Sequence, residues 1–172
     1  MSLRDFPGDK TIFVDAGIFV LHFAGVEPNK SECRDFLKRI ELGQIKALTV
    51  NFVIDEVIYS LLITKGSEIA QSKKIKTIQK KIKEDKVFAA TCYKEAEIFL
   101  EYLEILRLSG LSLEDVNYQI QKDSIHVGSD KLLLPHDALY VKICQNLGIA
   151  DIATTDLDFQ KADFLTIWKP GN

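Results

Sequence analysis

Thr11-Ile12-Phe13-Val14-Asp15 is a short run of apolar and β-branched residues that ends in a carboxylate. Such a run predicts a buried strand over 11–14. Similar short strands are predicted over 47–50 and over 151–155, and the latter is followed by Asp156. Because short buried strands alternate with helical segments, the sequence predicts an α/β protein with a parallel, doubly wound sheet.

The segments between these strands have helical periodicity. A last strand is predicted over 164–168, and Ser112 with Asp115 resembles a capping box, which predicts a short helix after them. The other predicted helices cover 17–23, a segment that starts at a Ser31 cap and ends before Gly43, 52–63 with Asn51 as its N-cap, a Lys-rich amphipathic segment over 67–86, 95–108, and 135–147 with Gly148 at its end.

Length and composition limit the class of protein. The chain has 172 residues, of which 47% are hydrophobic and 27% charged, which fits one folded domain over 1–172. The formal net charge of -3 argues against a nucleic-acid binder that relies on overall positive charge. The three scattered cysteines predict neither a disulfide framework nor a zinc site. With no apolar stretch long enough to span a bilayer and no secretion signal, we expect a soluble, cytoplasmic protein without a membrane partner.

Acidic side chains lie where the predicted strands end. Asp15 and Asp156 directly follow two strands, and Glu56 lies early in the helix that follows a third. Asp137 lies in the first turn of the 135–147 helix. Ligands of open α/β sheets bind at the carboxyl ends of the strands, so we expect these acids to converge. Glu56 lies off the apolar stripe of its helix, and its neighbour Asp55 remains an alternative.

Each acid also has a purely structural interpretation. Asp15 could cap the helix that follows it, and Asp137 could be favoured by the helix dipole alone. Asp156 and Asp158 could form a turn after their strand. Four converging carboxylates would, however, repel one another unless cations neutralised them. Hard divalent ions with oxygen ligands suit a site that lacks pairs of Cys and His, which predicts one or two Mg²⁺ or Mn²⁺ ions.

The order and spacing of these acids resemble the PIN-domain family of metal-dependent ribonucleases. The resemblance extends over residues 11–168, although the helical segment 66–131 carries none of it. The matching pieces are Phe13-Val14-Asp15, Asp55-Glu56-Val57, Asp137-Ala138-Leu139 and Thr154-Thr155-Asp156-Leu157-Asp158-Phe159. The chain departs from the family at Ala16 and Gly17, where Ser, Thr or Asn is common, so Asp15 would lack a hydroxyl from this segment.

The resemblance implies a fold, a site and an activity. The fold would be a three-layer α/β/α sandwich with a central parallel sheet. Metal-activated water would hydrolyse RNA phosphodiester bonds and leave a 5′-phosphate and a 3′-hydroxyl. Asp158 would be an outer ligand or a residue that shapes the loop, and Thr154 would orient the final acid. The four acids matching the family's catalytic and metal-binding positions are Asp15, Glu56, Asp137 and Asp156.

Family membership also implies candidate partners. Many PIN-domain proteins are toxins paired with an antitoxin protein, whereas others process cellular RNA, and the sequence does not choose between the two. A homodimer is a further expectation from the resemblance. A PIN-like domain that binds RNA or a protein without cleaving is the alternative function. A phosphoacceptor receiver domain fits less well, because a single Asp15, and not an acidic pair, follows the first strand.

Basic and histidine side chains have two interpretations each. The lysines of the 67–86 segment are either a solvated helix face or a ridge that contacts RNA phosphates. His136 is either a structural residue at a helix start or a group close to the scissile phosphate. The lysines that we take as candidate RNA contacts are Lys73, Lys74, Lys76, Lys80 and Lys81.

Overall fold

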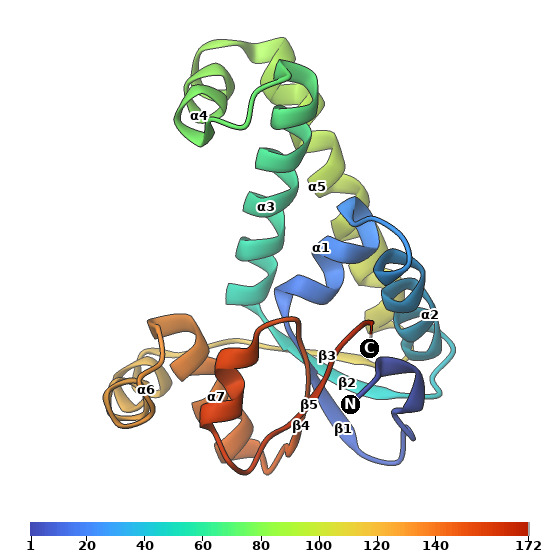
Figure 1. Cartoon of the computed structure of the whole chain (residues 1–172), viewed down its shortest axis with the longest axis vertical. Coiled ribbons are helices and arrows are strands. Elements are labelled where there is room, and N and C mark those ends of the chain that lie inside the picture. Colours follow the sequence, from blue (N-terminus) through green and yellow to red (C-terminus); the bar gives the residue numbers. More distant parts are fainter. Residues whose placement is uncertain (172) are drawn as a thin grey trace.

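The computed structural model describes residues 1–171 and is built around one parallel sheet (Figure 1). Its five strands lie in the order β3-β2-β1-β4-β5, and each neighbouring pair is parallel. The predicted α/β class with a central parallel sheet is therefore confirmed. The strands are β1 (Thr11–Val14), β2 (Lys46–Val50), β3 (Leu111–Glu114), β4 (Asp151–Ala153) and β5 (Thr166–Trp168).

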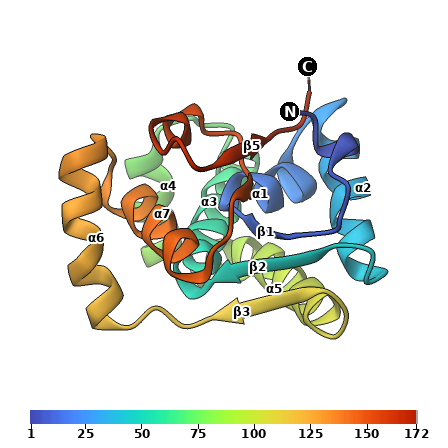
Figure 2. The ribbon, with the colours of Figure 1, turned by 90° about the horizontal axis from the view of Figure 1, so that it is seen from below.

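Helices cover both faces of the sheet, which completes a three-layer α/β/α sandwich (Figure 2). Helix α1 contacts α2 and α3, α5 contacts the same two helices, and α6 contacts α7 across the other face. Two short 3-10 helices flank these layers, η1 (Leu3–Asp5) and η2 (Leu157–Lys161). The α-helices are α1 (Ala16–Ala24), α2 (Asn29–Glu41), α3 (Asn51–Ala70), α4 (Ile75–Glu84), α5 (Lys86–Arg107), α6 (Tyr118–Lys131) and α7 (Pro135–Leu147).

The order in which the chain adds strands to the sheet reverses at β1, although all neighbouring strands run parallel. The sequence passes from β1 to β2 to β3 toward one edge of the sheet, and then returns through α6 and α7 to β4 on the other side of β1. Right-handed crossovers require the helices of these two halves to lie on opposite faces. The backbone N–H of Asp15 donates to the carbonyl of Ala153 (3.0 Å), which ties the ends of β1 and β4 together. This reversal is the position where open α/β sheets bind ligands.

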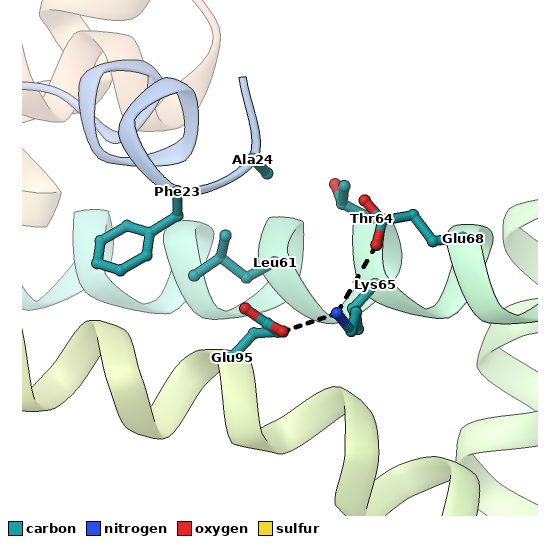
Figure 3. Close-up of a pocket in the computed structure, with 7 residues that line it drawn as sticks. All are labelled: Phe23, Ala24, Leu61, Thr64, Lys65, Glu68 and Glu95. Carbon is teal, nitrogen blue, oxygen red and sulfur yellow. Dashed lines mark ion pairs between the residues drawn. The ribbon is translucent and has the colours of Figure 1, made fainter. Parts of the chain in front are cut away.

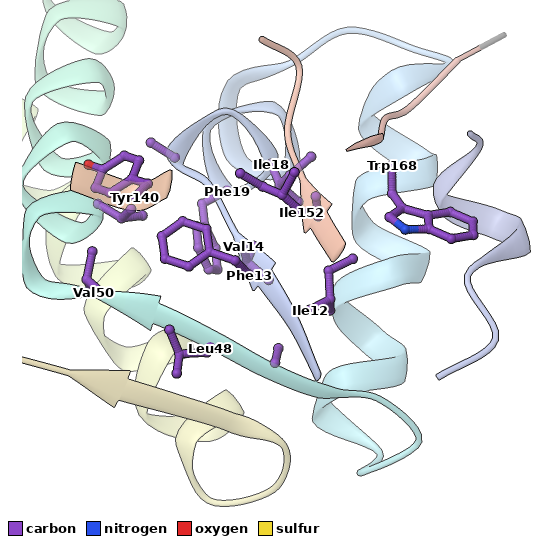
Figure 4. Packing of buried hydrophobic residues seen from close by; sticks show 14 of the residues in the cluster. Ile12, Phe13, Val14, Ile18, Phe19, Leu48, Val50, Tyr140, Ile152 and Trp168 are labelled. Carbon is purple, nitrogen blue, oxygen red and sulfur yellow. The ribbon is translucent and has the colours of Figure 1, made fainter. Parts of the chain in front are cut away.

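The central strands are apolar because helices bury both of their faces. Ile12, Phe13 and Val14 are fully buried, and the ring of Phe13 packs on that of Tyr140 from α7 (Figure 4). Continuous apolar strands are typical of parallel sheets covered on both sides. The hydroxyl of Thr49 is satisfied within this core by donating to the carbonyl of Val14 (2.9 Å).

A helical hairpin formed by α3, α4 and α5 extends beyond the sheet (Figure 1). Its far end has its own apolar cluster, in which Leu62, Ile78 and Phe88 are buried. A Cβ atom on Gly66 would lie 2.4 Å from Cγ2 of Ile78, so glycine allows α4 to pack closely on α3. The hairpin is thus stabilised by helix-to-helix packing independent of the sheet.

The prediction of a single Lys-rich helix over 67–86 is wrong. Helix α3 continues to Ala70, Gln71 takes a left-handed conformation (φ 48°), and α4 then packs back on α3. Asp85 starts α5 by accepting hydrogen bonds from the backbone N–H groups of Val87 and Phe88, both at 3.0 Å. The helix predicted to end at 63 therefore extends to Ala70, and the helix predicted to start at 95 begins at Lys86. The chain turns between these helices because the turns bury the apolar side of α4, and this packing outweighs the local preference for one continuous helix.

The capping box predicted at Ser112 is also wrong. Residues Leu111–Glu114 form β3, which pairs with β2 so that Ala47 lies opposite Leu111. The alternation of Leu111, Ser112 and Leu113 suits an edge strand with one covered face. The next helix, α6, is instead capped by Asn117, whose side chain accepts from the N–H of Ile120 (3.1 Å).

Other boundaries differ by a few residues. Strand β4 ends at Ala153 and not at 155, and Asn51 is the first residue of α3 and not its cap. The Asn51 side chain accepts from the N–H groups of Phe52 and Val116, which joins α3 to the segment after β3. Among the described residues, no helix combines the length and apolar character needed to cross a bilayer.

Candidate functional site

The predicted acids lie on or beside four elements that meet near the ends of β1 and β4, where the strand order reverses. Asp15 follows β1 and caps α1, whereas Asp156 follows β4 and caps η2. Glu56 is in the second turn of α3, and Asp137 is in the first turn of α7. Their local positions thus follow from where strands end and helices begin.

Three of the carboxylates form a tight group. Asp137, Asp156 and Asp158 each offer an oxygen atom, and these three atoms lie within 4.8 Å of one another. The side chain of Asp156 accepts from the N–H of Asp158 (2.8 Å), which shapes the turn. Asp158 also forms an ion pair with Lys161 (2.9 Å). The turn interpretation of Asp156 and Asp158 and their place in the acidic group are therefore compatible.

Asp15 is a buried carboxylate whose two oxygen atoms both accept hydrogen bonds. Oδ1 accepts from the N–H of Ala16 (2.7 Å) and Oδ2 from the hydroxyl of Thr154 (2.6 Å). Burial nevertheless raises the pKa of Asp15 to about 6, and the charges of Glu56 and Asp137 add to the rise. The helix-cap interpretation of Asp15 is correct, but these neighbours also make it part of an acidic cluster.

The pKa of Asp137 is raised in the same way. Its partial burial and the charges of Asp156, Glu56 and Asp158 raise its pKa to about 6, whereas His136 opposes the rise. A favourable helix dipole alone would not raise the pKa of a carboxyl. Asp137 thus lies within a group of like charges whose effect on its pKa His136 offsets only in part.

Glu56 is held by a histidine from the other side of the sheet. Nδ1 of His136 hydrogen-bonds Oε1 of Glu56, which links the start of α7 to α3. The neighbouring Asp55 is exposed and lies on another side of the helix, so the structure favours Glu56 over Asp55 as the member of the cluster. His136 also packs edge-on against Phe52, with ring centroids 5.6 Å apart.

Thr154 supplies the hydroxyl that the segment after Asp15 lacks. It donates to Asp15 and accepts from the backbone N–H of Asp156 (3.0 Å), so it connects two acids through one side chain. The family resemblance assigned Thr154 to the final acid alone. A Cβ atom on Gly17 would lie 2.6 Å from the hydroxyl of Thr155, so a side chain at residue 17 would require Thr155 to move.

Oxygen ligands of this kind fit a hard divalent cation. The three clustered oxygen atoms come from carboxylates, and the pKa values of Asp15 and Asp137 are raised mainly by burial and further by the charges of neighbouring carboxylates. Mg²⁺ and Mn²⁺ bind carboxylate oxygens preferentially. Asp137, Asp156 and Asp158 could hold one ion, and Asp15 with Glu56 would face it.

Comparison with known proteins adds independent evidence. The PIN domain model matches residues 12–165, which span β1 to the residue before β5. The chain belongs to the PIN domain family. Ribonuclease VapC2 of Methanocaldococcus jannaschii is 29% identical over 160 residues, which cover 92% of this chain and 93% of that protein. Ribonuclease VapC6 of the same organism is 32% identical over 66 residues, which cover 38% of this chain and 43% of that protein.

Two solved structures share the PIN fold at low sequence identity. PAE2754 from Pyrobaculum aerophilum has a TM-score of 0.52 and 15% identity, covering 91% of this chain and 88% of that one. VapBC2 from Rickettsia felis, bound to a DNA fragment from their promoter, has a TM-score of 0.54 and 14% identity, covering 94% and 100%. These likenesses confirm the predicted three-layer fold.

The candidate RNA-contacting lysines lie away from the acids of this PIN domain. Lys73 and Lys74 precede α4, and Lys76, Lys80 and Lys81 are on it, at the far end of the helical hairpin (Figure 1). The length of α3 from Glu56 to its end is about 20 Å. The five lysines are exposed, as a solvated helix face would be.

Two cavities formed by the described residues lie outside the group of Asp15, Glu56, Asp137, Asp156 and Asp158. One, of about 110 Å³, lies between the end of α1 and the helices α3 and α5 (Figure 3). Its Lys65 is already paired with Glu95 (2.9 Å) and Glu68 (3.8 Å), which leaves little free charge for a ligand. A larger groove of about 620 Å³ lies beside β2 and β3 and is lined by residues such as Leu48 and Ser112.

The structure brings two further side chains of α7 close to the acids. His136, for which the sequence left a structural and a functional interpretation open, hydrogen-bonds Glu56, and Tyr140, which no sequence pattern indicated, stacks on His136. Both lie on α7 with Asp137, at positions 136 and 140, one helical turn apart. This spacing could have indicated a shared face, but its relation to Glu56 depends on contact between helices of different halves of the fold.

Proposed function

We propose that this chain is a metal-dependent ribonuclease that hydrolyses RNA phosphodiester bonds at the cluster around Asp137. The main observation behind this proposal is that one carboxylate oxygen each of Asp137, Asp156 and Asp158 lie within 4.8 Å of one another, near the buried Asp15. The proposal is supported by family membership and by similarity, over nearly the whole chain, to a protein named ribonuclease. We further propose that residues 1–172 form one nuclease domain, of which residue 172 lies outside the described residues.

The chain's own residues would bind the metal and orient the acids. Asp137, Asp156 and Asp158 would hold Mg²⁺ or Mn²⁺, while Thr154 and the N–H of Ala16 keep Asp15 in place. A bound ion of this kind activates water and neutralises charge on a phosphodiester. Glu56, held by His136, would complete the negative pocket facing it. The products would carry a 5′-phosphate and a 3′-hydroxyl, and one or two ions would be bound.

The decisive test is cleavage of a mixed-sequence single-stranded RNA with Mg²⁺ or Mn²⁺, with EDTA as the metal-free arm. Asp137→Asn and Glu56→Gln should abolish or strongly reduce cutting, because each removes one carboxylate from the cluster. Asp55→Asn is the matched control, since Asp55 is exposed beside Glu56 and should leave the rate unchanged. Cutting that persists in Asp137→Asn would contradict the proposed site.

Binding without cleavage is the other outcome of this test. If the wild type cuts no RNA but still binds Mn²⁺ and RNA, the chain is a PIN-like binding domain and not a nuclease. If it binds neither, the proposal is wrong.

We further propose that the ribonuclease is the toxin of a toxin–antitoxin pair. The name VapC of two relatives and the VapBC2 complex support this assignment. Expression in a bacterium should arrest growth, and the Asp137→Asn variant should not. Normal growth at high expression of a protein that cuts RNA in vitro would favour a processing nuclease instead.

A homodimer and a cytoplasmic location stay predictions. Light scattering on the purified chain should give twice the 19.5 kDa mass of one chain if it is a dimer.

We propose that Lys73, Lys74, Lys76, Lys80 and Lys81 contact RNA only where the RNA extends along the helical hairpin. Charge reversal at Lys76 and Lys80 should then weaken binding of long RNA and leave short substrates unaffected.

A further inference from the structure

Tyr140 has a buried hydroxyl without a hydrogen-bond partner. The side chain lies on α7 and is only 1% exposed. Within residues 1–171, its hydroxyl oxygen is one of two buried side-chain polar atoms that lack a partner, the other being Nδ1 of His22. A buried hydroxyl left unpaired is costly, and native proteins pair nearly all such groups. The surroundings of this hydroxyl therefore indicate which group it would bond.

The Tyr140 ring lies in a row of aromatic side chains that ends at Glu56. On one side it packs against Phe13 with ring centroids 5.3 Å apart. On the other it stacks on His136, with centroids 6.2 Å apart and planes inclined by 28°. The same His136 hydrogen-bonds Glu56. In Figure 4 the hydroxyl oxygen of Tyr140 points to the side where α3 lies, and α3 carries Glu56.

The charges around the phenol identify its neighbours. Burial is the main cause that raises the pKa of Tyr140, followed by the charges of Glu56 and Asp15, and Asp137 contributes as well. A hydrogen-bonding contact with Glu56 is also among these causes, although the two groups do not meet the geometry of a hydrogen bond. The hydroxyl therefore lies near the Glu56 carboxylate without forming a hydrogen bond to it in this structure. A neutral phenol can donate a hydrogen bond, and the charged groups near it are carboxylates, which can only accept one.

We propose that the Tyr140 hydroxyl donates a hydrogen bond to the Glu56 carboxylate and, with His136, holds it toward Asp15 and Asp137. Tyr140 is thus a positioning residue, and its effect on metal binding rests on the proposed function. A glutamate has a longer and more mobile side chain than an aspartate, so a single contact from a half-exposed histidine would restrain it poorly. Asp15 already has two such supports, Thr154 and the N–H of Ala16.

The contact itself can be tested without metal by a double-mutant cycle. Tyr140→Phe keeps the ring and its packing and removes only the hydroxyl. In metal-free protein, Tyr140→Phe should shift the melting temperature differently in the wild-type and Glu56→Ala backgrounds, because in the latter the hydroxyl has lost its acceptor. Equal shifts in both backgrounds would overturn the proposal. Tyr102→Phe, on α5 and stacked on His22, is the matched control and should show no coupling to Glu56→Ala.

The effect on the site is measured by titrating Mn²⁺ with electron paramagnetic resonance, which reports binding independently of cleavage. Groups that orient metal-binding carboxylates typically contribute 10- to 100-fold to metal affinity, and we expect Tyr140→Phe to weaken Mn²⁺ binding by about 10-fold. Tyr102→Phe should bind as the wild type does. Unchanged Mn²⁺ affinity in Tyr140→Phe would overturn the positioning role.

Failure of the proposed function would look different. In that case the wild type itself would bind no Mn²⁺ and cut no RNA. The metal-free cycle would then still decide whether Tyr140 bonds Glu56.

Discussion

Thr154 connects the buried acid of β1 to the acid that follows β4. Its hydroxyl donates to Asp15 at 2.6 Å and accepts from the N–H of Asp156 at 3.0 Å. The hydrogen bond from Thr154 lowers the pKa of Asp15 and so favours its charged form, whereas burial raises the pKa and favours the neutral form. Ala16 and Gly17 contribute no hydroxyl, and the structure does not need one from them.

Replacing Thr154 should impair the site more than it impairs the fold. We expect Thr154→Val to weaken Mn²⁺ binding by about 10- to 100-fold, because the carboxylate of Asp15 loses its hydroxyl donor. Thr49→Val is the matched control: it also removes a buried hydroxyl, which donates to the carbonyl of Val14, and should lower stability without changing Mn²⁺ affinity. Calorimetric titration of both variants decides the matter, and equal affinities would contradict this role.

The helical hairpin formed by α3, α4 and α5 illustrates how elements are determined by packing. Its sequence has a nearly continuous helical pattern from 52 to 108, yet the chain turns at Gln71 and at Asp85. The turns allow Ile78 to be fully buried between α3 and α5. Gly66 lies at the closest approach.

A substitution at Gly66 tests this packing. Gly→Ala inside an exposed helix usually stabilises by about 0.5–1 kcal/mol. Here the sign should reverse, because the new Cβ would lie 2.4 Å from Cγ2 of Ile78, and overpacking typically costs about 1–3 kcal/mol. Urea unfolding should show Gly66→Ala as destabilised. The double variant with Ile78→Ala should be less destabilised than the sum of the two single changes, and strict additivity would argue against the clash.

In the whole molecule, burial and, to a smaller extent, repulsion between carboxylates destabilise the charged forms of Asp15 and Asp137 at the carboxyl edge of the sheet. Burial raises the pKa of both Asp15 and Asp137 to about 6, so each binds a proton more tightly in the folded than in the unfolded chain. Between pH 6 and 4 the folded state therefore holds more protons, and the metal-free protein should become more stable as the pH falls. For the buried Asp15 alone, the shift corresponds to about 3 kcal/mol of stability absent at neutral pH.

Thermal unfolding as a function of pH measures the combined effect of burial and repulsion on these two carboxylates. In EDTA, the melting temperature should rise between pH 7.5 and pH 5, and saturating Mn²⁺ should raise it at pH 7.5, since a cation relieves the same repulsion. A variant carrying Asp15→Asn and Asp137→Asn should show a flatter pH profile and little response to Mn²⁺. A wild-type profile as flat as that of the variant would refute the assignment.

Local pattern was sufficient to predict the strands at 11–14 and 47–50, the helix at 135–147 and the order of the acids. Buried parallel strands are short apolar runs, and a carboxylate at their end is conspicuous, so neither depends on distant contacts. Family membership, now established over residues 12–165, follows from the same residues. The predicted α/β/α architecture was correct for this reason.

Only the tertiary structure decided the contacts between segments remote in sequence. β3 is a strand because Leu111–Glu114 pairs with β2, whereas its isolated pattern suggested a helix cap. Thr154 reaches Asp15 across 139 residues, and His136 reaches Glu56 across 80. Helical periodicity and capping signals report on neighbours within about one turn. Partners brought together by the sheet and its crossovers leave no such local signal. The sequence therefore indicated the acids, and Thr154 beside the last of them, but not the contacts of Thr154 with Asp15 and of His136 with Glu56.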